Sequence, residues 1–213
     1  MAVESPMRVP YNLPGSQQWQ WINIFTRMSQ ERIIFLNQTL TMGLANSLIA
    51  SMLYLDSQDS GKPIYLYINS YGDPVATGEA NEGAGFMSVA ATLSVYDTMR
   101  HIKSEIHTIC LGQAVGLAAL ILSAGTKTKR ASLPHSMLAL SQPYSGVQGQ
   151  ATDIQVNAQE VKAKRQLMLD IFASTTGQTA ERIDRDMQRL FYLSPAEAVE
   201  YGLIDRVITS SKS

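Results

Sequence analysis

A strand-to-helix junction near the middle of the chain has the composition on which hydrolases commonly place a nucleophile. Residues 112–125 read GQAVGLAALILSAG and follow a β-like run, HTICL. Small residues let such a junction turn sharply, and many hydrolases carry a serine at the tip of the turn. Here the turn carries Val115, Gly116 and Leu117, and none of these side chains is a nucleophile. The sequence therefore predicts the support for a nucleophile without the nucleophile.

The histidines and the cysteine do not have the spacing of metal ligands. His101, His107 and His135 form no HExxH-type pattern, and Cys110 is the only cysteine in the chain. We therefore expect no metal site and no intrachain disulfide. A lone cysteine also fits a reducing compartment.

A glycine-containing segment, GEANEGAG at residues 78–85, is a poor candidate for a phosphate-binding loop. Glu79 and Glu82 would repel a phosphate, and no GK[ST] pattern follows. We interpret the segment as a loop and expect no cofactor.

Composition excludes several classes of partner. The chain has 213 residues, 45% of them apolar, and a net charge of -1, which fits one domain with a buried core. Without a basic excess, we expect no nucleic-acid partner. The longest apolar run, residues 114–122, is too short to cross a bilayer, and the first residues lack a secretory signal. The expected location is the cytoplasm or an organelle stroma.

The elements that must position the junction alternate along the chain. Residues 1–20, with three prolines, predict an extended arm. Apolar patterns predict strands at 31–37, 63–69, 105–111, 129–133, 137–140 and 203–208. Helical spacing predicts helices at 40–55, 94–102, 153–174 and 195–201, with a loop at 70–85. Strands that alternate with helices predict an α/β fold.

Six motifs in order resemble the ClpP family of serine peptidases (peptidase family S14). They are IYLYINS (64–70), VYDTM (95–99), GQA (112–114), AGTKTKRASLPHS (124–136), QGQATDI (148–154) and EAVEYGLID (197–205). The resemblance covers residues 24–208. It implies a ClpP/crotonase-like spiral of β-β-α units with a protruding handle helix. It also implies an arm at 1–20, a ClpP-like domain at 21–208 with its handle at about 144–174, and a tail at 209–213.

The resemblance also implies that the three catalytic positions have been replaced. Gly116, in GQAVGLAA, stands where the family has its serine. Ser141, in SQP, stands in the place of the histidine, and Leu190, in RLFYLSPAEA, stands in the place of the aspartate. Such a chain is most similar to ClpR, the inactive ClpP-like subunit of cyanobacteria and plastids. We therefore expect no enzymatic activity.

The oxyanion-binding turn of the family is altered as well. In the family, a PGG-type turn after INS supplies a backbone N–H; here INS is followed by YGDP and an enlarged loop at 71–94. We do not expect Gly72 or Asp73 to supply that donor.

What remains, by the same resemblance, serves assembly. The chain is expected to join active ClpP-type subunits in a mixed ring, with Gln142 and Arg189 near the contact between rings. A Clp ATPase chaperone, ClpC-like or ClpX-like, is expected to dock at Tyr65 and Tyr67, which are otherwise explained as surface-strand tyrosines. The implied location is a cyanobacterial cytoplasm or a plastid stroma, with no membrane partner.

Two alternatives belong to other classes. The first is an active hydrolase, or a crotonase-like acyl-CoA enzyme, with relocated catalytic residues. The second is a stand-alone homo-oligomeric scaffold. Labelling by a serine-reactive phosphonate or CoA-ester binding favours the first, and stable rings of this chain alone favour the second.

Overall fold

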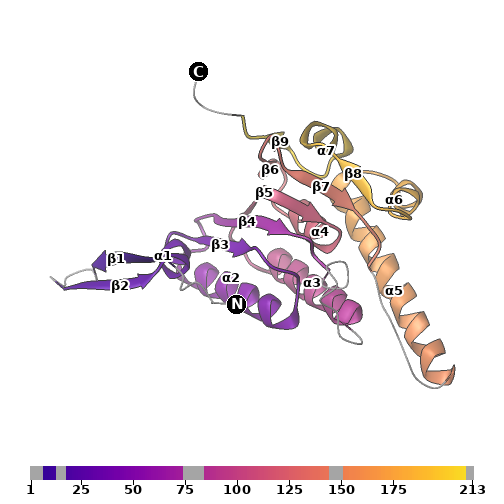
Figure 1. The fold of residues 1–213 in the computed structure, drawn as a ribbon, viewed down its shortest axis with the longest axis horizontal. Coiled ribbons are helices and arrows are strands. Elements are labelled where there is room, and N and C mark those ends of the chain that lie inside the picture. Colours follow the sequence, from indigo (N-terminus) through magenta and orange to yellow (C-terminus); the bar gives the residue numbers. More distant parts are fainter. Residues whose placement is uncertain (1–6, 13–17, 74–83, 144–150, 210–213) are drawn as a thin grey trace.

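The structure is a computed structural model, which describes residues 7–12, 18–73, 84–143 and 151–209 (Figure 1). Its strands are β1 (Arg8–Asn12), β2 (Trp19–Asn23), β3 (Ile33–Leu36), β4 (Ile64–Ser70), β5 (Ile106–Val115), β6 (Arg130–Ser132), β7 (Met137–Leu140), β8 (Phe191–Leu193) and β9 (Arg206–Val207). Its helices are α1 (Ile24–Gln30), α2 (Met42–Gln58), α3 (Ala84–His101), α4 (Leu117–Ser123), α5 (Ala151–Thr176), α6 (Ala180–Asp186) and α7 (Pro195–Tyr201).

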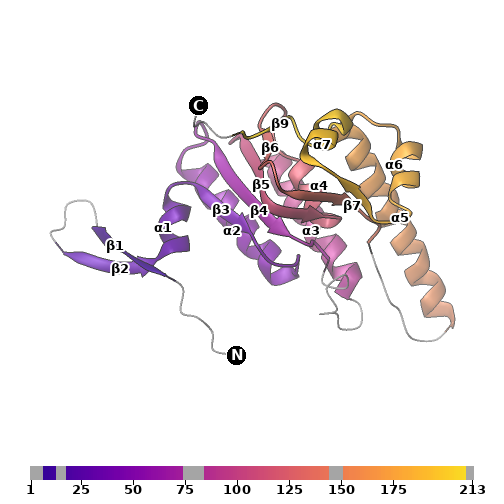
Figure 2. The same ribbon diagram turned by 45° about the horizontal axis from the view of Figure 1, so that its top comes forward.

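A largely parallel sheet organises the body of the protein. Strands β3, β4, β5, β6 and β9 follow one another as parallel neighbours, and β7 pairs with the end of β5. Strand β8 is the exception, because it pairs antiparallel with β7. Parallel neighbours need crossover connections, and α2 and α3 supply them on one face of the sheet (Figures 1 and 2). The α/β fold class predicted from the sequence is confirmed.

Helix α4 lies at the centre of the core. All seven of its residues are buried, and it contacts α3, α5 and β5. A helix that is apolar on every side is stable only when it is enclosed on every side. This burial fixes the start of α4, where β5 turns into the helix.

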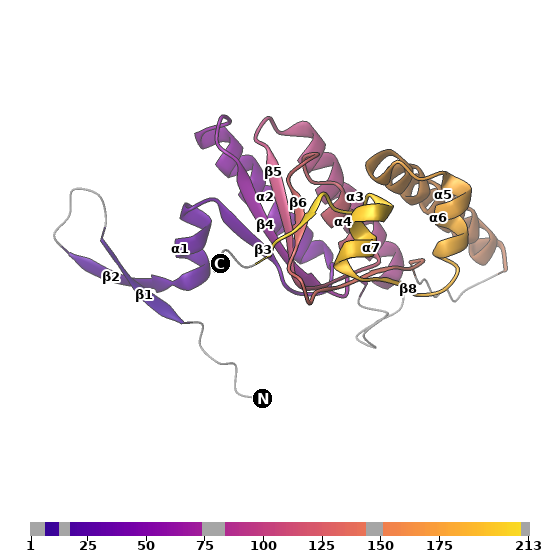
Figure 3. The same cartoon turned by 90° about the horizontal axis from the view of Figure 1, so that it is seen from above.

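The N-terminal arm forms a hairpin. Strands β1 and β2 pair antiparallel, and Figures 2 and 3 show them standing away from the sheet. Extended structure was expected here, but the pairing was not. The boundary expected after residue 20 falls inside β2, where Trp19 and Trp21 give the strand its β propensity.

The enlarged loop expected at 71–94 is shorter than predicted. Helix α3 begins at Ala84, so residues 84–94 are helical. Val89, Val95 and Met99 are buried beside α2, and this tertiary packing favours helix where the local composition indicated a loop. Residues 74–83 lie outside the described part.

The predicted handle helix is α5, whose amino-terminal half extends beyond the rest of the body (Figure 1). Its carboxyl-terminal half is anchored, because Met168, Leu169 and Phe172 are buried against the core. The segment expected before it, residues 144–150, lies outside the described residues.

Helix α7 has the ends that the sequence predicts. The Ser194 hydroxyl accepts a hydrogen bond from the Glu197 N–H, and the Glu197 carboxylate accepts one from the Ser194 N–H, which completes a capping box. Gly202 ends the helix with a φ of 86°, and a side chain there would meet the Thr176 carbonyl oxygen.

Candidate functional site

The predicted turn between strand and helix is present at Gly116. Strand β5 ends at Val115 and α4 begins at Leu117. Between them Gly116 has φ 53° and ψ -109°, a conformation that side-chain-bearing residues rarely adopt. Its N–H donates to the Ala139 carbonyl oxygen at 2.9 Å, which joins this turn at residues 115–117, the elbow, to β7.

Ser141 lies directly beside this elbow. Strand β7 pairs with β5 through Ala139 and Val115, and Ser141 follows the end of β7. A Cβ built on Gly116 would lie 2.5 Å from the Ser141 Oγ. The Ser141 hydroxyl therefore occupies part of the space that a side chain at position 116 would need.

Leu190 lies near the same end of β7, just before β8, which pairs with β7. Strands β7 and β8 are antiparallel, and their last pair is Leu140 with Phe191. Ser141 directly follows Leu140 and Leu190 directly precedes Phe191, so the two residues adjoin this last pair, and Leu190 is 41% exposed. Three positions far apart in the sequence thus lie where β5 and β7 end and β8 begins. Gly116, Ser141 and Leu190 provide one hydroxyl there and no base or acid.

The histidines of the chain lie elsewhere. His107 is near the start of β5, at the opposite end from Gly116, where its Nε2 is 3.3 Å from the Glu105 Oε2. His135 is exposed in the turn before β7, and Ser141 follows the other end of that strand. At about 3.3 Å per residue, the length of β7 alone separates them by more than about 10 Å. His101 ends α3, before β5 begins.

The N–H groups of Gly72 and Asp73, in the turn after β4, both donate within that turn. The Gly72 N–H donates to the Ser70 Oγ at 2.9 Å, and the Asp73 N–H donates to the Tyr71 carbonyl oxygen at 2.9 Å. Gly72 has φ 76°, and a Cβ there would lie 2.5 Å from the Val115 carbonyl oxygen. The turn therefore packs tightly on the elbow, with both N–H groups used within the turn itself.

An ion pair holds the other end of α4. Arg130 is buried and donates to both carboxylate oxygens of Asp205, at 2.6 and 3.0 Å. Its remaining guanidinium nitrogen donates to the carbonyl oxygens of Ser123 and Thr175. Burial acts to raise the pKa of Asp205, but the hydrogen bonds and charge of Arg130 outweigh it and lower that pKa. Sequence reasoning missed this pair, because 75 residues separate its members.

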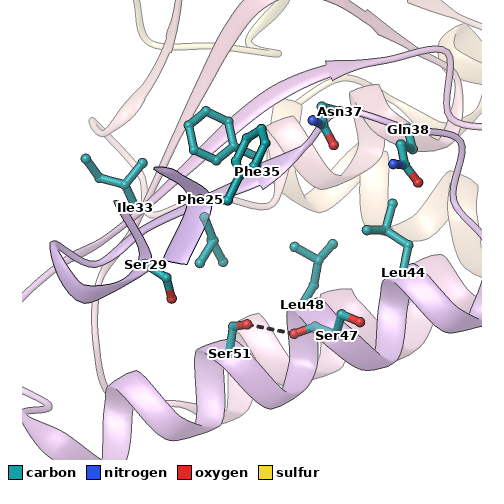
Figure 4. Close-up of a pocket in the computed structure, with 11 residues that line it drawn as sticks. Phe25, Ser29, Ile33, Phe35, Asn37, Gln38, Leu44, Ser47, Leu48 and Ser51 are labelled. Atoms are coloured by element: carbon teal, nitrogen blue, oxygen red, sulfur yellow. Dashed lines mark hydrogen bonds between the residues drawn. The ribbon is translucent and has the colours of Figure 1, made fainter. Parts of the chain in front are cut away.

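A groove between β3 and α2 contains serines without a base. It has a volume of about 280 Å³, and Figure 4 shows Ser29, Ser47 and Ser51 among its apolar lining residues. The Ser51 hydroxyl donates to the Ser47 carbonyl oxygen at 2.8 Å, and the Ser47 hydroxyl donates to Gly43 at 3.0 Å. Among the described residues that line this groove, none has an ionisable side chain. The groove therefore lacks the means to activate a serine.

The two tyrosines proposed for docking share one face of β4. Both are half-buried on the face opposite the buried Ile64, Leu66 and Ile68. Tyr67 stacks on Phe35 with ring centroids 5.6 Å apart, and Tyr65 meets the ring of His107 edge-on at 5.0 Å. These contacts fit the cross-strand interpretation as well, so docking stays a prediction.

Gln142 and Arg189 lie at the same edge as the elbow. Gln142 follows Ser141 and is half-buried, and Arg189 precedes Leu190 and is exposed. Leu140 and Phe191, each two residues away from one of them, are paired, so the two residues lie beyond the same end of the β7–β8 ladder. Their role between rings stays a prediction.

Within the described ranges, no group of His, Cys, Asp and Glu side chains is arranged to hold a metal ion. None of the described helices combines the length and apolarity needed to cross a bilayer.

The fold and the elbow define an α/β protein with the strand–turn–helix junction that serine hydrolases use. The family model for Clp protease matches residues 15–211. The chain is 50% identical over 202 residues to the ATP-dependent Clp protease proteolytic subunit 2 of Prochlorococcus marinus (strain NATL2A), with 94% of each chain covered. It is 48% identical over 202 residues to proteolytic subunit 3 of Synechococcus sp. (strain CC9902), with the same coverage. The chain belongs to the Clp protease family, which confirms the resemblance drawn from its motifs.

Proposed function

We propose that this chain is a catalytically inactive, ClpR-like subunit of a Clp protease core. The observation that carries the proposal is the meeting of Gly116, Ser141 and Leu190 at the elbow. A serine peptidase needs a nucleophile, a base and an acid at one place, and these side chains supply no such set.

The energetic deficit is large. Removing a catalytic triad lowers turnover by about 10⁶, or roughly 8 kcal/mol of barrier. The catalysis that survives in such variants depends on oxyanion stabilisation. The N–H groups of Gly72 and Asp73 are engaged within their own turn, so this contribution is weakened too. We infer that the chain contributes no measurable peptide hydrolysis.

The function that remains is assembly with active subunits. In the proposal the chain takes a place in a mixed ring with active ClpP-type subunits and lowers the number of working sites. Tyr65 and Tyr67 lie half-buried on one face of β4, and such partly exposed aromatic rings support the docking of a ClpC-like or ClpX-like ATPase there. The proposed location is a cyanobacterial cytoplasm or a plastid stroma.

The decisive experiment produces the chain with and without the active ClpP-type subunit of its source. Native mass spectrometry should detect a complex that contains both chains. A fluorogenic peptide should be cleaved by the mixed complex and not by this chain alone. Replacing the catalytic serine of the active subunit with alanine should abolish all cleavage by the mixed complex. Cleavage that persists, or a serine-directed phosphonate attached to this chain, would contradict the proposal.

A further inference from the structure

One face of strands β3, β4 and β5 carries two rows of half-buried side chains. Ile33, Tyr65 and His107 are register partners in one row, and Phe35, Tyr67 and Ile109 are register partners in the next. Side chains alternate between the two faces of a sheet, and the residues between these six are buried on the other face. We call the six residues the aromatic face. Among their side chains, only that of histidine commonly changes its charge between about pH 5 and about pH 8.

His107 is part of the aromatic face rather than a separate polar site. Its ring meets the Tyr65 ring edge-on, with centroids 5.0 Å apart and planes at 80°. Its side chain is 18% exposed. In the next row, Tyr67 stacks on Phe35 with centroids 5.6 Å apart. A partner that covers the two tyrosines would therefore also take the His107 imidazole out of water.

The charged groups around His107 lie near the ends of the strands. The Glu105 carboxylate is within ion-pair distance of the ring, 3.3 Å from Nε2, and is 56% exposed. Arg32 directly precedes β3, and its guanidinium donates to the carbonyl oxygens of Leu55 and Pro63. The other charged side chains that flank these strands in the described ranges are Asp56, Asp59, Lys62, Lys103, Lys129 and Arg206. Asp59 pairs with Lys62 and Asp56 accepts the Ser104 hydroxyl, so Glu105 is the carboxylate that His107 has beside it.

We propose that His107 makes the docking of the Clp ATPase on the aromatic face dependent on pH, with weaker docking when His107 is protonated. Docking excludes water from this face, and burying a charged imidazolium costs more free energy than burying a neutral imidazole. The attraction of a carboxylate that stays largely in water is screened, so Glu105 offsets little of that cost. Apolar anchors of the partner supply no counter-charge.

The direction of the pH dependence follows from proton linkage. Because the docked state favours neutral His107, docking that starts from the charged form has to release a proton. The affinity is therefore highest above the pH range in which the histidine titrates, and it falls as the pH decreases through that range. We expect the dissociation constant to rise about tenfold from about pH 8 to about pH 6.

This inference rests on the proposed function, because it concerns the pH dependence of the docking proposed there. The experiment uses the mixed complex of this chain with the active ClpP-type subunit and a ClpC-like ATPase of the same source. The ATPase is immobilised, and binding of the complex is measured by biolayer interferometry at both pH values. His107→Gln stays neutral and should lose the tenfold difference that the parent shows. His107→Lys stays charged and should bind weakly at both pH values.

The matched control is His135→Gln, in the exposed turn before β7, which should retain the response of the parent. All complexes share the pH dependence of the ATPase and of the active subunits, so a difference between variants reports His107 alone. Tyr67→Ala at the higher pH tests the docking itself. If it leaves binding unchanged, the proposed docking is contradicted and the inference is overturned with it. If it weakens binding but His107→Gln keeps the response of the parent, the inference alone is overturned.

Discussion

Replacing Gly116 with serine tests whether the nucleophile is the only part that the elbow lacks. The substitution places a side chain at φ 53° and ψ -109°, which costs about 1–3 kcal/mol of backbone strain. The new Cβ would lie 2.5 Å from the Ser141 Oγ, so the Ser141 hydroxyl has to rotate away. We expect Gly116→Ser to lower the melting temperature by about 2–10 °C and to leave the fold intact.

The same variant should not hydrolyse peptides, because the added hydroxyl finds no histidine at Ser141 and no acid at Leu190. The triple variant Gly116→Ser, Ser141→His, Leu190→Asp supplies all three groups at one edge of the sheet. A complete triad contributes about 10⁶ to turnover. Loss of an oxyanion donor costs about 10²–10³, and the N–H groups of Gly72 and Asp73 are engaged in the turn after β4. We therefore expect the triple variant to exceed the parent by about 10³–10⁴.

The assay is cleavage of a fluorogenic peptide, combined with labelling by a serine-directed phosphonate and mapping of the label. The double variant Gly116→Ser, Leu190→Asp is the matched control, because it lacks only the histidine. Our reasoning would be refuted if Gly116→Ser alone cleaved the peptide at the rate of the triple variant. In that case a base that we have not identified would serve the elbow.

Further predictions concern stability, reactivity and docking. Gly72→Ala should destabilise the protein by several kcal/mol, seen as a lower denaturation midpoint, because its Cβ would meet backbone atoms of the elbow. Asp205→Ala should cost about 3 kcal/mol by leaving Arg130 buried without its partner. Because the pKa of Asp205 is lowered in the folded state, its contribution is complete above about pH 5 and is lost as the pH falls below about 4; unfolding of the variant should therefore depend less on pH in that range. Burial raises the pKa of the Cys110 thiol to about 11, so iodoacetamide at pH 8 should label it only after unfolding. Tyr67→Ala should weaken ATPase binding to the mixed complex, measured by co-sedimentation, with Tyr192→Ala, exposed on β8, as the control.

Local signals in the sequence were sufficient to predict several helices and strands. The capping box of Ser194 and Glu197 and the terminating Gly202 define α7 within nine residues, and the structure places all three as predicted. The pairing of β1 with β2 and the start of α3 at Ala84 were not predicted. The start of α3 depends on burial beside α2, and a local pattern does not report burial against a distant element.

The candidate site, too, depends on contacts between distant residues that a local sequence pattern does not report. The turn at Gly116 was predictable from its neighbours, because small residues between a strand and a buried helix indicate a sharp junction. Its closeness to Ser141 and Leu190 was only implied by the family resemblance. Two registers bring the three positions together, one between β5 and β7 and one between β7 and β8. Such registers join residues far apart in the chain, and no sequence periodicity encodes them.

The proposed loss of catalysis is compatible with the survival of the fold, because the catalytic side chains and the atoms that hold the elbow in place are different. The elbow is held by its backbone: Gly116 bonds to Ala139, Gly72 packs on Val115, and the whole of α4 is buried. Leu190 is 41% exposed and Ser141 is half-buried, so neither side chain carries much of the core packing. Replacing catalytic side chains at these positions therefore raises the activation barrier for hydrolysis by about 8 kcal/mol and changes the folding free energy little. A subunit of this kind can lose hydrolysis and still present the surfaces through which a ring assembles.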